Sequence, residues 1–361
     1  MNILHLEAST GWGGQEIRIL KEAIGMRQKG HTIVFVIAKG GILAKKAREN
    51  NFQVYELFFA KKYWLFTLFA LFNICKKEKI QLVNTHSSLD AWIGGIAAKL
   101  LRLPVVRTRH LSAKVKKGLN SRIIYNYLAD FVVTTCTKIV PILSEQSKKN
   151  LSYFKSIPTG IEPSRVSYQE NDALSFREKY HVAKDDILIG MVCFMRSWKG
   201  IEDFFGAAKI LKNHKNLKWM IIGKGHSETY IRKAKEMQLE GQIIFTGHLD
   251  DPFTAIGALD IFTLLSTANE GVSQASLQAA FLKKPLITTS TGGLCEVCLN
   301  NKTGIIVPTH SPDKVAEAVL QLTNGSLRKE YGENAHNLVK KQFYFEKTIN
   351  DMEKVYAKLV S

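Results

Sequence analysis

Short apolar segments alternate with longer, partly polar segments along almost the whole chain. In the first half the apolar segments are residues 3–6, 32–38, 53–58, 82–85, 105–109 and 129–135. The same alternation resumes in the second half, with apolar segments at 187–193, 219–222, 243–246 and 261–265. Strands that alternate with helices in this way form parallel sheets covered by helices on both faces. The sequence therefore predicts an α/β protein.

The length and composition are those of a globular protein with more than one domain. The chain has 361 residues, of which 45% are hydrophobic and 23% charged, so two α/β domains can each bury a core. Polar, charged sequence leads up to Asp172, between the two alternating halves. We place the first domain at 1–165 and the start of the second at residue 166.

The stretch 266–307 predicts a loop, a helix, a short strand, a glycine turn and a last strand. Gly271 would let the backbone approach a ligand closely, and Glu270 stands just before it. Gln278 lies two turns along the predicted helix. A phosphate would bind the helix dipole and the amides at the helix start, which are those of Val272, Ser273 and Gln274. A capped helix with no ligand is the alternative.

Two cations stand beside another predicted helix start. Arg196 and Lys199 follow the strand 187–193 and precede a helix that begins at Ile201. Together with the helix amides, these two cations would neutralise a diphosphate. The next strand runs into Gly223-Lys224-Gly225, a lone G-x-G that is a weak signal by itself.

A glycine-rich loop follows the first predicted strand. Gly13 and Gly14 stand between the strand 3–6 and a helix predicted over 17–29, an arrangement that binds phosphates or sugars. A dinucleotide-binding fold would place an acidic residue near the end of the next strand. That strand ends in Lys39-Gly40-Gly41 instead, which disfavours NAD as a ligand.

A basic loop follows the strand 105–109, at the edge where open α/β sheets bind ligands. His110 starts this loop and would be able to donate to a diphosphate, a sugar hydroxyl or an acceptor. His86, after the strand 82–85, is a weaker candidate on the acceptor side. Further cations of the loop are Lys114, Lys116, Lys117 and Arg122. A solvated basic loop without a ligand is the alternative.

The segment 61–77 is apolar and aromatic, with a lysine pair at each end. Its small or polar positions (Thr67, Ala70 and Asn73) recur at helical spacing, so a helix buried in the domain core is favoured over one laid on lipid. No apolar run reaches the ~20 residues that a membrane span needs. The N-terminus is a predicted strand without the basic region of a signal peptide.

The cysteines favour a reducing compartment. Five cysteines are an odd number in a long chain, so a disulfide framework is not expected. Cys295 and Cys298 form a C-x-x-C pair, but no second pair stands at zinc-like spacing. The expected location is the cytoplasm.

Several of these motifs resemble one known family. The sequence EGVSQASLQAA, the turn GGLCEV and the closing KTGIIV are similar to the donor-binding signature of the group 1 (family 4) glycosyltransferases, which have the GT-B fold. Glu270 matches the first glutamate of that signature and Glu296 the last. Gln278 departs from it, because the family has a second glutamate there. Arg196 and Lys199 match the family's Gly-Arg-x-x-x-x-Lys-Gly at a shortened spacing.

The resemblance implies two Rossmann-like domains that face each other across a cleft. The donor-binding domain would span 166–342, and a C-terminal helix, 343–361, would return to the first domain. The implied reaction is a retaining transfer of a sugar from a nucleotide-sugar donor to an acceptor that is bound mainly by the first domain.

The resemblance also implies roles for individual residues. The implied catalytic residues are Glu270, His110, Arg196 and Lys199. The implied donor-binding residues are Gly13, Gly14, Gly223, Gly225, Gly247, Gly271, Val272, Ser273, Gln274, Gln278 and Glu296. The residues expected on the acceptor or membrane side are His86, Lys114, Lys116, Lys117 and Arg122. No metal and no cofactor is expected, since the cations and helix dipoles would carry the charge of the diphosphate. The amide of Gln278 would still bind a ribose, because it both donates and accepts hydrogen bonds.

The formal net charge of +18 leaves several partners open. Nucleic acid, an anionic membrane face and an anionic substrate each fit such a charge. We expect a nucleotide-sugar donor, a glycan or glycolipid acceptor such as a lipopolysaccharide precursor, and peripheral attachment to the inner face of the cytoplasmic membrane. A sugar-nucleotide epimerase of the same fold is one alternative. A basic nucleic-acid-binding protein is another, although the basic residues are spread along the chain and no RNA-module signature is present.

Overall fold

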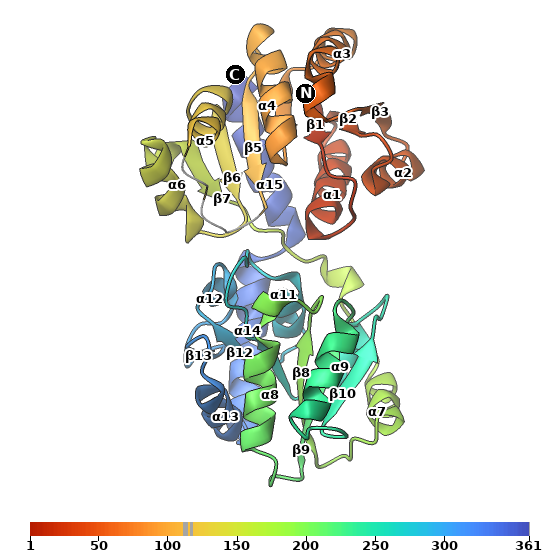
Figure 1. Ribbon diagram of the computed structural model, residues 1–361, viewed down its shortest axis with the longest axis vertical. Coiled ribbons are helices and arrows are strands. Elements are labelled where there is room, and N and C mark those ends of the chain that lie inside the picture. Colours follow the sequence, from red (N-terminus) through yellow and green to blue (C-terminus); the bar gives the residue numbers. More distant parts are fainter. Residues whose placement is uncertain (111–114, 116–117, 361) are drawn as a thin grey trace. The chain divides into compact units, whose positions relative to one another are not determined.

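The computed structural model describes residues 1–110, 115 and 118–360, and these form two compact units (Figure 1). The first unit consists of Met1–Thr159 together with Glu346–Ser361, and the second consists of Gly160–Phe345. The chain thus leaves the first unit once and comes back to it at the C-terminus.

The first unit is built on a seven-stranded parallel sheet with the order β3-β2-β1-β4-β5-β6-β7. Its strands are β1 (Asn2–Glu7), β2 (Thr32–Ala38), β3 (Gln53–Leu57), β4 (Leu82–Thr85), β5 (Val105–Arg109), β6 (Phe131–Thr134) and β7 (Phe154–Ser156). Its helices are α1 (Gly14–Gln28), α2 (Ile42–Glu49), α3 (Trp64–Lys77), α4 (Ser88–Leu100), α5 (Leu119–Ile123), α6 (Ile139–Ser147) and α15 (Phe345–Val360). The expected parallel sheet is confirmed. The edge strand β7 escaped prediction, because three residues are too few to show a period.

The second unit repeats this plan with six parallel strands in the order β10-β9-β8-β11-β12-β13. Its strands are β8 (Ile187–Val192), β9 (Leu217–Ile222), β10 (Ile243–Gly247), β11 (Ile261–Leu264), β12 (Leu286–Thr289) and β13 (Gly304–Val307). Its helices are α7 (Glu170–Lys179), α8 (Ile201–Ile210), α9 (Ser227–Glu236), α10 (Phe253–Ala258), α11 (Gln274–Phe281), α12 (Leu294–Val297), α13 (Pro312–Gln321) and α14 (Gly325–Gln342).

Both sheets are doubly wound, and the order of the strands reverses once in each. β1 lies between β2 and β4, and β8 lies between β9 and β11. Open α/β sheets bind ligands outside the carboxyl ends of the strands, at the point where the order reverses. A functional site is therefore expected at the loops that follow β1, β4, β8 and β11.

The C-terminal helix α15 belongs to the first unit and is held there by a buried polar network. The Tyr356 hydroxyl donates to Glu22 Oε1 at 2.5 Å and accepts from Asn84 Nδ2 at 2.7 Å. The Thr108 hydroxyl donates to Asn84 Oδ1 at 2.9 Å. Arg18 lies 3.8 Å from Glu22, and both side chains are almost completely buried. The network joins α15 to α1, β4 and β5, and the predicted return of this helix is observed.

One expectation about helix α3 is wrong. We expected the segment 61–77 to be a core helix, but only one face of it is buried, through Thr67, Leu71, Ile74 and Cys75. Thr67 points inward, and its hydroxyl donates to the Phe58 carbonyl at 2.7 Å. Phe69 on the other face is 66% exposed. Polar residues normally mark the outer face of a helix. When apolar residues occur on every side, as in α3, the sequence does not show which face is buried.

Candidate active site

The loop after β11 brings Glu270 to the carboxyl edge of the second sheet. Glu270 is only 6% exposed. Its Oε1 accepts a 2.7 Å hydrogen bond from the Ser266 hydroxyl and a hydrogen bond from the Lys199 ammonium. A buried carboxylate is stabilised when a cation and a hydroxyl both donate to it. The structure thus joins two predicted catalytic residues, 71 positions apart, into one ion pair.

Gly200 makes this ion pair sterically possible. It follows Lys199 directly and has φ of +71°. A Cβ atom at this position would lie 2.0 Å from the Leu265 carbonyl oxygen, so only glycine permits the approach. The amide of Thr267 then donates to the Trp198 carbonyl at 2.8 Å. The loops after β8 and β11 are therefore held together through their backbones.

Arg196 does not share the position of Lys199. Its guanidinium carbon lies 4.9 Å from the ring centre of Phe194 and 5.1 Å from that of Trp198, and the side chain is exposed. It lines a cavity of about 530 Å³ with Phe194, Ser197, Trp198, His226, Thr229 and Tyr230. The two cations predicted to act together thus have different neighbours, with Lys199 at Glu270 and Arg196 among aromatic rings.

The start of α11 follows Glu270 closely, as predicted. Ser273 caps this helix, and its hydroxyl accepts from the Ser276 amide at 3.3 Å. Val272 is buried. Three residues around the cap, and one further along the helix, keep part of their surface exposed: Gly271, Ser273, Gln274 and Gln278. The arrangement is a capped helix start beside a buried ion pair.

The turn after β12 reaches the same loop. The Gly293 amide donates to the Glu270 carbonyl at 3.2 Å, and Gly293 immediately precedes the short helix α12. Glu296 lies on α12 and is half-buried. The first and last glutamates of the motif are therefore carried by backbone segments that contact each other.

The glycines after β9 are explained by packing within the chain. A Cβ atom at Gly223 would lie 2.0 Å from the Cys193 carbonyl oxygen, and one at Gly225 would lie 2.5 Å from that of Met195. The Gly223 amide donates to the Gly247 carbonyl at 2.9 Å. Gly247 differs from the other two, since it is exposed and a Cβ atom there would meet no atom within 4 Å, although its φ of +73° still favours glycine.

The N-terminal glycines have no such explanation. Gly13 has an extended backbone with φ of −157°, and a Cβ atom at Gly14 would meet no atom within 4 Å. The Gly13 amide donates to Glu16 Oε2 at 2.9 Å, which caps α1. Packing and conformation therefore leave room for a side chain at both positions.

Three histidines form a hydrogen-bonded chain across the first sheet. His5 lies in β1, His86 directly follows β4, and His110 directly follows β5. His5 Nδ1 lies 2.9 Å from His86 Nε2, and His86 Nδ1 lies 3.0 Å from His110 Nε2. Burial lowers the pKa of all three imidazoles, that of His5 to about 3, so all are neutral near pH 7.

Carboxylates stand beside this histidine chain. Burial, with Asp90 nearby, raises the pKa of Glu7 to about 7. Glu7 accepts from the Ser9 amide at 2.7 Å and from Gln15 Nε2 at 2.5 Å. Burial also raises the pKa of Asp90, although Arg107 at 3.8 Å opposes the shift. The edge of the first sheet thus holds a buried set of titratable groups.

Sequence reasoning missed much of this cluster. The residues that it did not single out are His5, Glu7, Arg18, Glu22 and Asp90. A signal was present in the first strand, because His5 and Glu7 interrupt an otherwise apolar run at alternate positions. Polar residues inside a buried strand indicate partners from other elements, but they do not identify those partners.

Part of the predicted basic loop lies outside the described residues, namely Lys114, Lys116 and Lys117. Arg122 is described and exposed, and it lines a second cavity of about 950 Å³ in the first unit. Other residues around this cavity are Tyr125, Asn126, Glu145, Lys148 and Lys149. The cavity is separate from the histidine chain, since none of its lining residues belongs to that chain.

Within the described ranges, no group of three or more histidine, cysteine, aspartate or glutamate side chains is arranged to hold a metal ion. Cys295 Sγ lies 3.6 Å from the Gly292 carbonyl oxygen, and Cys298 Sγ lies 3.7 Å from that of Leu286. The same part of the chain contains no helix that is both long and apolar enough to cross a membrane.

Solved structures that superpose on almost the whole of this chain share its pair of doubly wound units. A glycosyltransferase from Rickettsia africae superposes with a TM-score of 0.90 at 22% sequence identity, over 100% of this chain and 98% of that one. HepE from Anabaena, solved in complex with UDP and glucose, superposes with a TM-score of 0.85 at 18% identity, over 99% and 100% of the two chains. The fold of this chain is therefore GT-B.

Two family models divide the chain between them. The model for Glycosyltransferase Family 4 matches residues 12–165, and the model for Glycosyl transferases group 1 matches residues 172–338. The chain therefore belongs to the group 1 (family 4) glycosyltransferases, and it is an enzyme.

Characterised and uncharacterised relatives agree with this assignment. An uncharacterized glycosyltransferase of Methanocaldococcus jannaschii is 27% identical over 350 residues, which are 87% of this chain and 86% of the relative. The capsular polysaccharide biosynthesis glycosyltransferase CapM of Staphylococcus aureus is 26% identical over 309 residues, 80% of each chain. The Escherichia coli UDP-Gal:alpha-D-GlcNAc-diphosphoundecaprenol alpha-1,3-galactosyltransferase is 24% identical over 308 residues, 81% of this chain and 79% of the relative.

Proposed function

We propose that this glycosyltransferase moves a sugar from a nucleotide-sugar donor to a glycan or glycolipid acceptor, with retention of anomeric configuration and without a metal ion. The observation that carries the proposal is the buried Lys199–Glu270 ion pair beside the start of α11. Two findings on similar proteins support it: HepE was solved with UDP and glucose, and the Escherichia coli relative is named for a UDP-galactose donor and a diphosphoundecaprenol acceptor.

The donor would bind to the second unit. Its diphosphate gains negative charge as the sugar leaves, and preorganised cations and helix amides stabilise that charge. Lys199 would supply one cation, and Arg196 another if its exposed side chain turns toward the phosphates. Glu270 would accept hydrogen bonds from hydroxyls of the donor sugar. Gln278 would bind the ribose through its amide oxygen and nitrogen.

The glycine loops and α12 would complete the donor site. A nucleotide needs close backbone approach, which the open space at Gly247 would allow in the second unit, and Gly13 and Gly14 stay predicted ligand-binding residues of the first unit. The amides around Ser273 would face the phosphates, and Glu296 would contact the sugar from α12.

The acceptor would bind to the first unit. His110, at the end of the histidine chain, would donate to the transferring sugar or the diphosphate. His86 would hold the His110 imidazole in place through the hydrogen bond between them. Arg122 and the cavity that it lines are the proposed acceptor side, together with the predicted loop cations Lys114, Lys116 and Lys117. We propose the cytoplasm as the location, with peripheral attachment to the inner face of the membrane.

A screen of nucleotide sugars by thermal shift tests the donor, because a ligand at a hundred times its dissociation constant adds ~2.7 kcal/mol of stability. UDP-, GDP- and ADP-sugars are the first set. Transfer is then measured with the stabilising donor in the presence of EDTA, and NMR of the product gives its anomeric configuration. Loss of transfer in EDTA would contradict metal independence, and an inverted product would contradict retention.

The two other functions give different outcomes in the same assays. An epimerase would convert or hydrolyse the donor with no acceptor present. A nucleic-acid-binding protein would retain RNA through purification at high salt and would show no thermal shift with any nucleotide sugar.

A further inference from the structure

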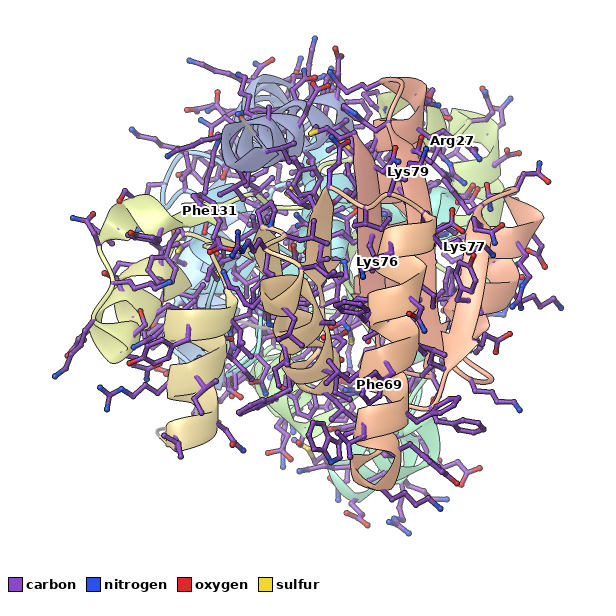
Figure 2. The ribbon with its side chains drawn as sticks, turned by 90° about the horizontal axis from the view of Figure 1, so that it is seen from above. Arg27, Phe69, Lys76, Lys77, Lys79 and Phe131 are labelled. Carbon is purple, nitrogen blue, oxygen red and sulfur yellow. The ribbon has the colours of Figure 1, made fainter. Side chains whose placement is uncertain are left out.

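The outer face of α3, with the turn just before it, carries several large apolar side chains that are exposed in the part of the chain that the structure describes. Phe66 and Phe69 are 65% and 66% exposed, and three other large side chains at the start of this helix are also exposed: Tyr63, Trp64 and Leu65. Single exposed hydrophobic residues are ordinary on a protein surface, but a contiguous group marks an interaction site. Figure 2 shows Phe69 on the outer surface of α3, with Lys76 and Lys77 further along the same helix.

Cations stand at both ends of this apolar face. Lys62 precedes it, and its ammonium lies 4.8 Å from the ring centre of Tyr63. Lys76 follows it, with its ammonium 4.4 Å from the ring centre of Phe72. Both lysines are exposed, as are Lys77 and Lys79 beyond them. None of the described carboxylates forms an ion pair with Lys62 or Lys76.

The region around α3 carries an excess of positive charge. Residues 61–79 include five lysines and one glutamate, which gives a net charge of +4. The single glutamate, Glu78, accepts a 2.5 Å hydrogen bond from the Tyr55 hydroxyl. An unbalanced cluster of lysines around aromatic side chains fits an anionic surface and disfavours a cationic one, such as a second copy of this chain with its +18 charge.

The geometry points to an anionic lipid bilayer as the occupant. We propose that the α3 surface, defined as Lys62–Phe66, Phe69, Lys76 and Lys77, lies flat on such a bilayer and holds the first unit there. A 14-residue helix is about 21 Å long, so a helix lying flat can bring the exposed Phe66 and Phe69 near its start and the exposed lysines at its end to the same bilayer surface. Tyrosine and tryptophan favour that region, and lysine stems extend their ammonium groups toward the phosphates.

This inference deepens the proposed function, on which it rests for its purpose, since a lipid-linked acceptor is presented at a membrane. Binding itself needs no donor or acceptor and can be measured alone. It also assigns the attachment to α3 rather than to the basic loop at Lys114, Lys116, Lys117 and Arg122.

Co-sedimentation of the full chain with vesicles tests the inference. One set is pure phosphatidylcholine, and the other contains phosphatidylcholine and phosphatidylglycerol in equal parts. We expect binding to the second set only, reduced at high salt. The double variant Phe66→Ser/Phe69→Ser should lose at least tenfold in vesicle affinity. Lys62→Gln/Lys76→Gln should lose about fivefold for each lysine.

Matched variants in the second unit are the controls. Leu174 and Ile231 are also exposed apolar residues, at 50% and 49%, so Leu174→Ser/Ile231→Ser should bind vesicles as the wild type does. Lys212→Gln/Lys215→Gln removes the same charge from exposed positions and should weaken binding by less than twofold. The urea unfolding midpoint of each variant is the control for folding, and it should equal that of the wild type.

Equal vesicle affinity of the wild type and Phe66→Ser/Phe69→Ser would overturn the inference, as would binding that is lost only when the basic loop is changed. A dimer that dissociates in the double variant, without vesicle binding, would make a second copy the occupant. Sugar transfer to a soluble acceptor separates this inference from the proposed function. If the protein transfers sugar but does not bind vesicles, only the docking surface is refuted. If it binds vesicles but transfers sugar from no donor, only the proposed function is refuted.

Discussion

His86 Nδ1 lies 3.0 Å from His110 Nε2, so the residue at the sheet edge is hydrogen-bonded to one that is almost fully buried. The second nitrogen of His86 is bonded to His5, and His5 Nε2 has no partner among the described residues. Neutral imidazoles donate through one nitrogen and accept through the other, so the protons along the chain all point one way. A buried N–H without an acceptor is rare, which favours a lone pair on His5 Nε2. His110 then accepts at Nε2 and carries its proton on Nδ1.

We expect His86→Phe to lower turnover about tenfold to a hundredfold, because it removes the hydrogen bond that sets the tautomer of His110. The Michaelis constant for the donor should change less. A lost tautomer preference is visible in the ¹⁵N shifts of the His110 imidazole, which should report a mixture. His86→Gln keeps one donor and one acceptor and should recover part of the activity. An unchanged His110 tautomer in His86→Phe would show that the chain has no positioning role.

Lys199→Ala and Glu270→Ala should each reduce turnover by a factor on the order of 100 or more, since each removes a preorganised contact to the reacting groups. Lys233→Ala is the matched control, because Lys233 pairs with Glu202 on the exposed surface of the same unit. Its turnover should equal that of the wild type. Full activity in both site variants, with the donor identified, would refute the site.

Gln278→Glu should keep turnover within about tenfold, because it exchanges one competent ribose partner for another. Gln278→Ala should raise the Michaelis constant for the donor more than it lowers turnover. Steady-state kinetics with the identified donor separate the two effects. A collapse of turnover at unchanged donor affinity would instead place Gln278 at the reacting sugar.

The histidine chain makes the free energy of unfolding depend on pH. Its folded-state pKa values lie below the unfolded value near 6.5, so the unfolded chain binds more protons than the folded chain below that pH. Stability is therefore present above pH 6.5 and is lost as the pH falls, at up to ~1.4 kcal/mol per pH unit for each histidine. His5→Gln should flatten this loss between pH 4 and 6 in urea titrations. An unchanged slope would contradict a neutral buried His5.

Glu7 changes the free energy of unfolding with pH in the opposite direction to the histidines. Its folded pKa of about 7 lies above the unfolded value of 4.5, so its contribution is complete below pH 4.5 and is lost as the pH rises through 7. Glu7→Gln should therefore gain stability relative to the wild type as the pH rises from 5 to 8. The measurement is the difference between the two urea midpoints at each pH. A constant difference would show that Glu7 is ionised throughout.

Gly200→Ala should destabilise the second unit by about 2 kcal/mol or more, because its Cβ atom would lie 2.0 Å from the Leu265 carbonyl oxygen at a left-handed φ. Gly14→Ala is the matched control, with no atom within 4 Å, and should stay within ~0.5 kcal/mol of the wild type. Urea denaturation measures both. If the loop at Gly14 contacts the donor, that variant should also show a raised Michaelis constant.

Much of the second unit was predictable because its motif residues are close in sequence or lie at strand ends. Glu270 and the start of α11 are close in sequence, and Lys199 lies in the loop after a predicted strand, β8, which the structure pairs with β11. The separation of Arg196 from Lys199 was not predictable. It depends on the rings of Phe194 and Trp198, whose contact with the guanidinium is a matter of side-chain packing.

The sequence by itself determined the two sets of parallel strands and the family, because hydrophobic periodicity and consecutive motifs are local properties of the chain. Tertiary structure decided the histidine chain, whose members His5 and His86 are 81 residues apart and meet only when β1 pairs with β4. It also decided which face of α3 is exposed. Apolar residues surround that helix on all sides, so only its packing against the sheet could select Thr67 as an inward residue and Phe69 as an outward one.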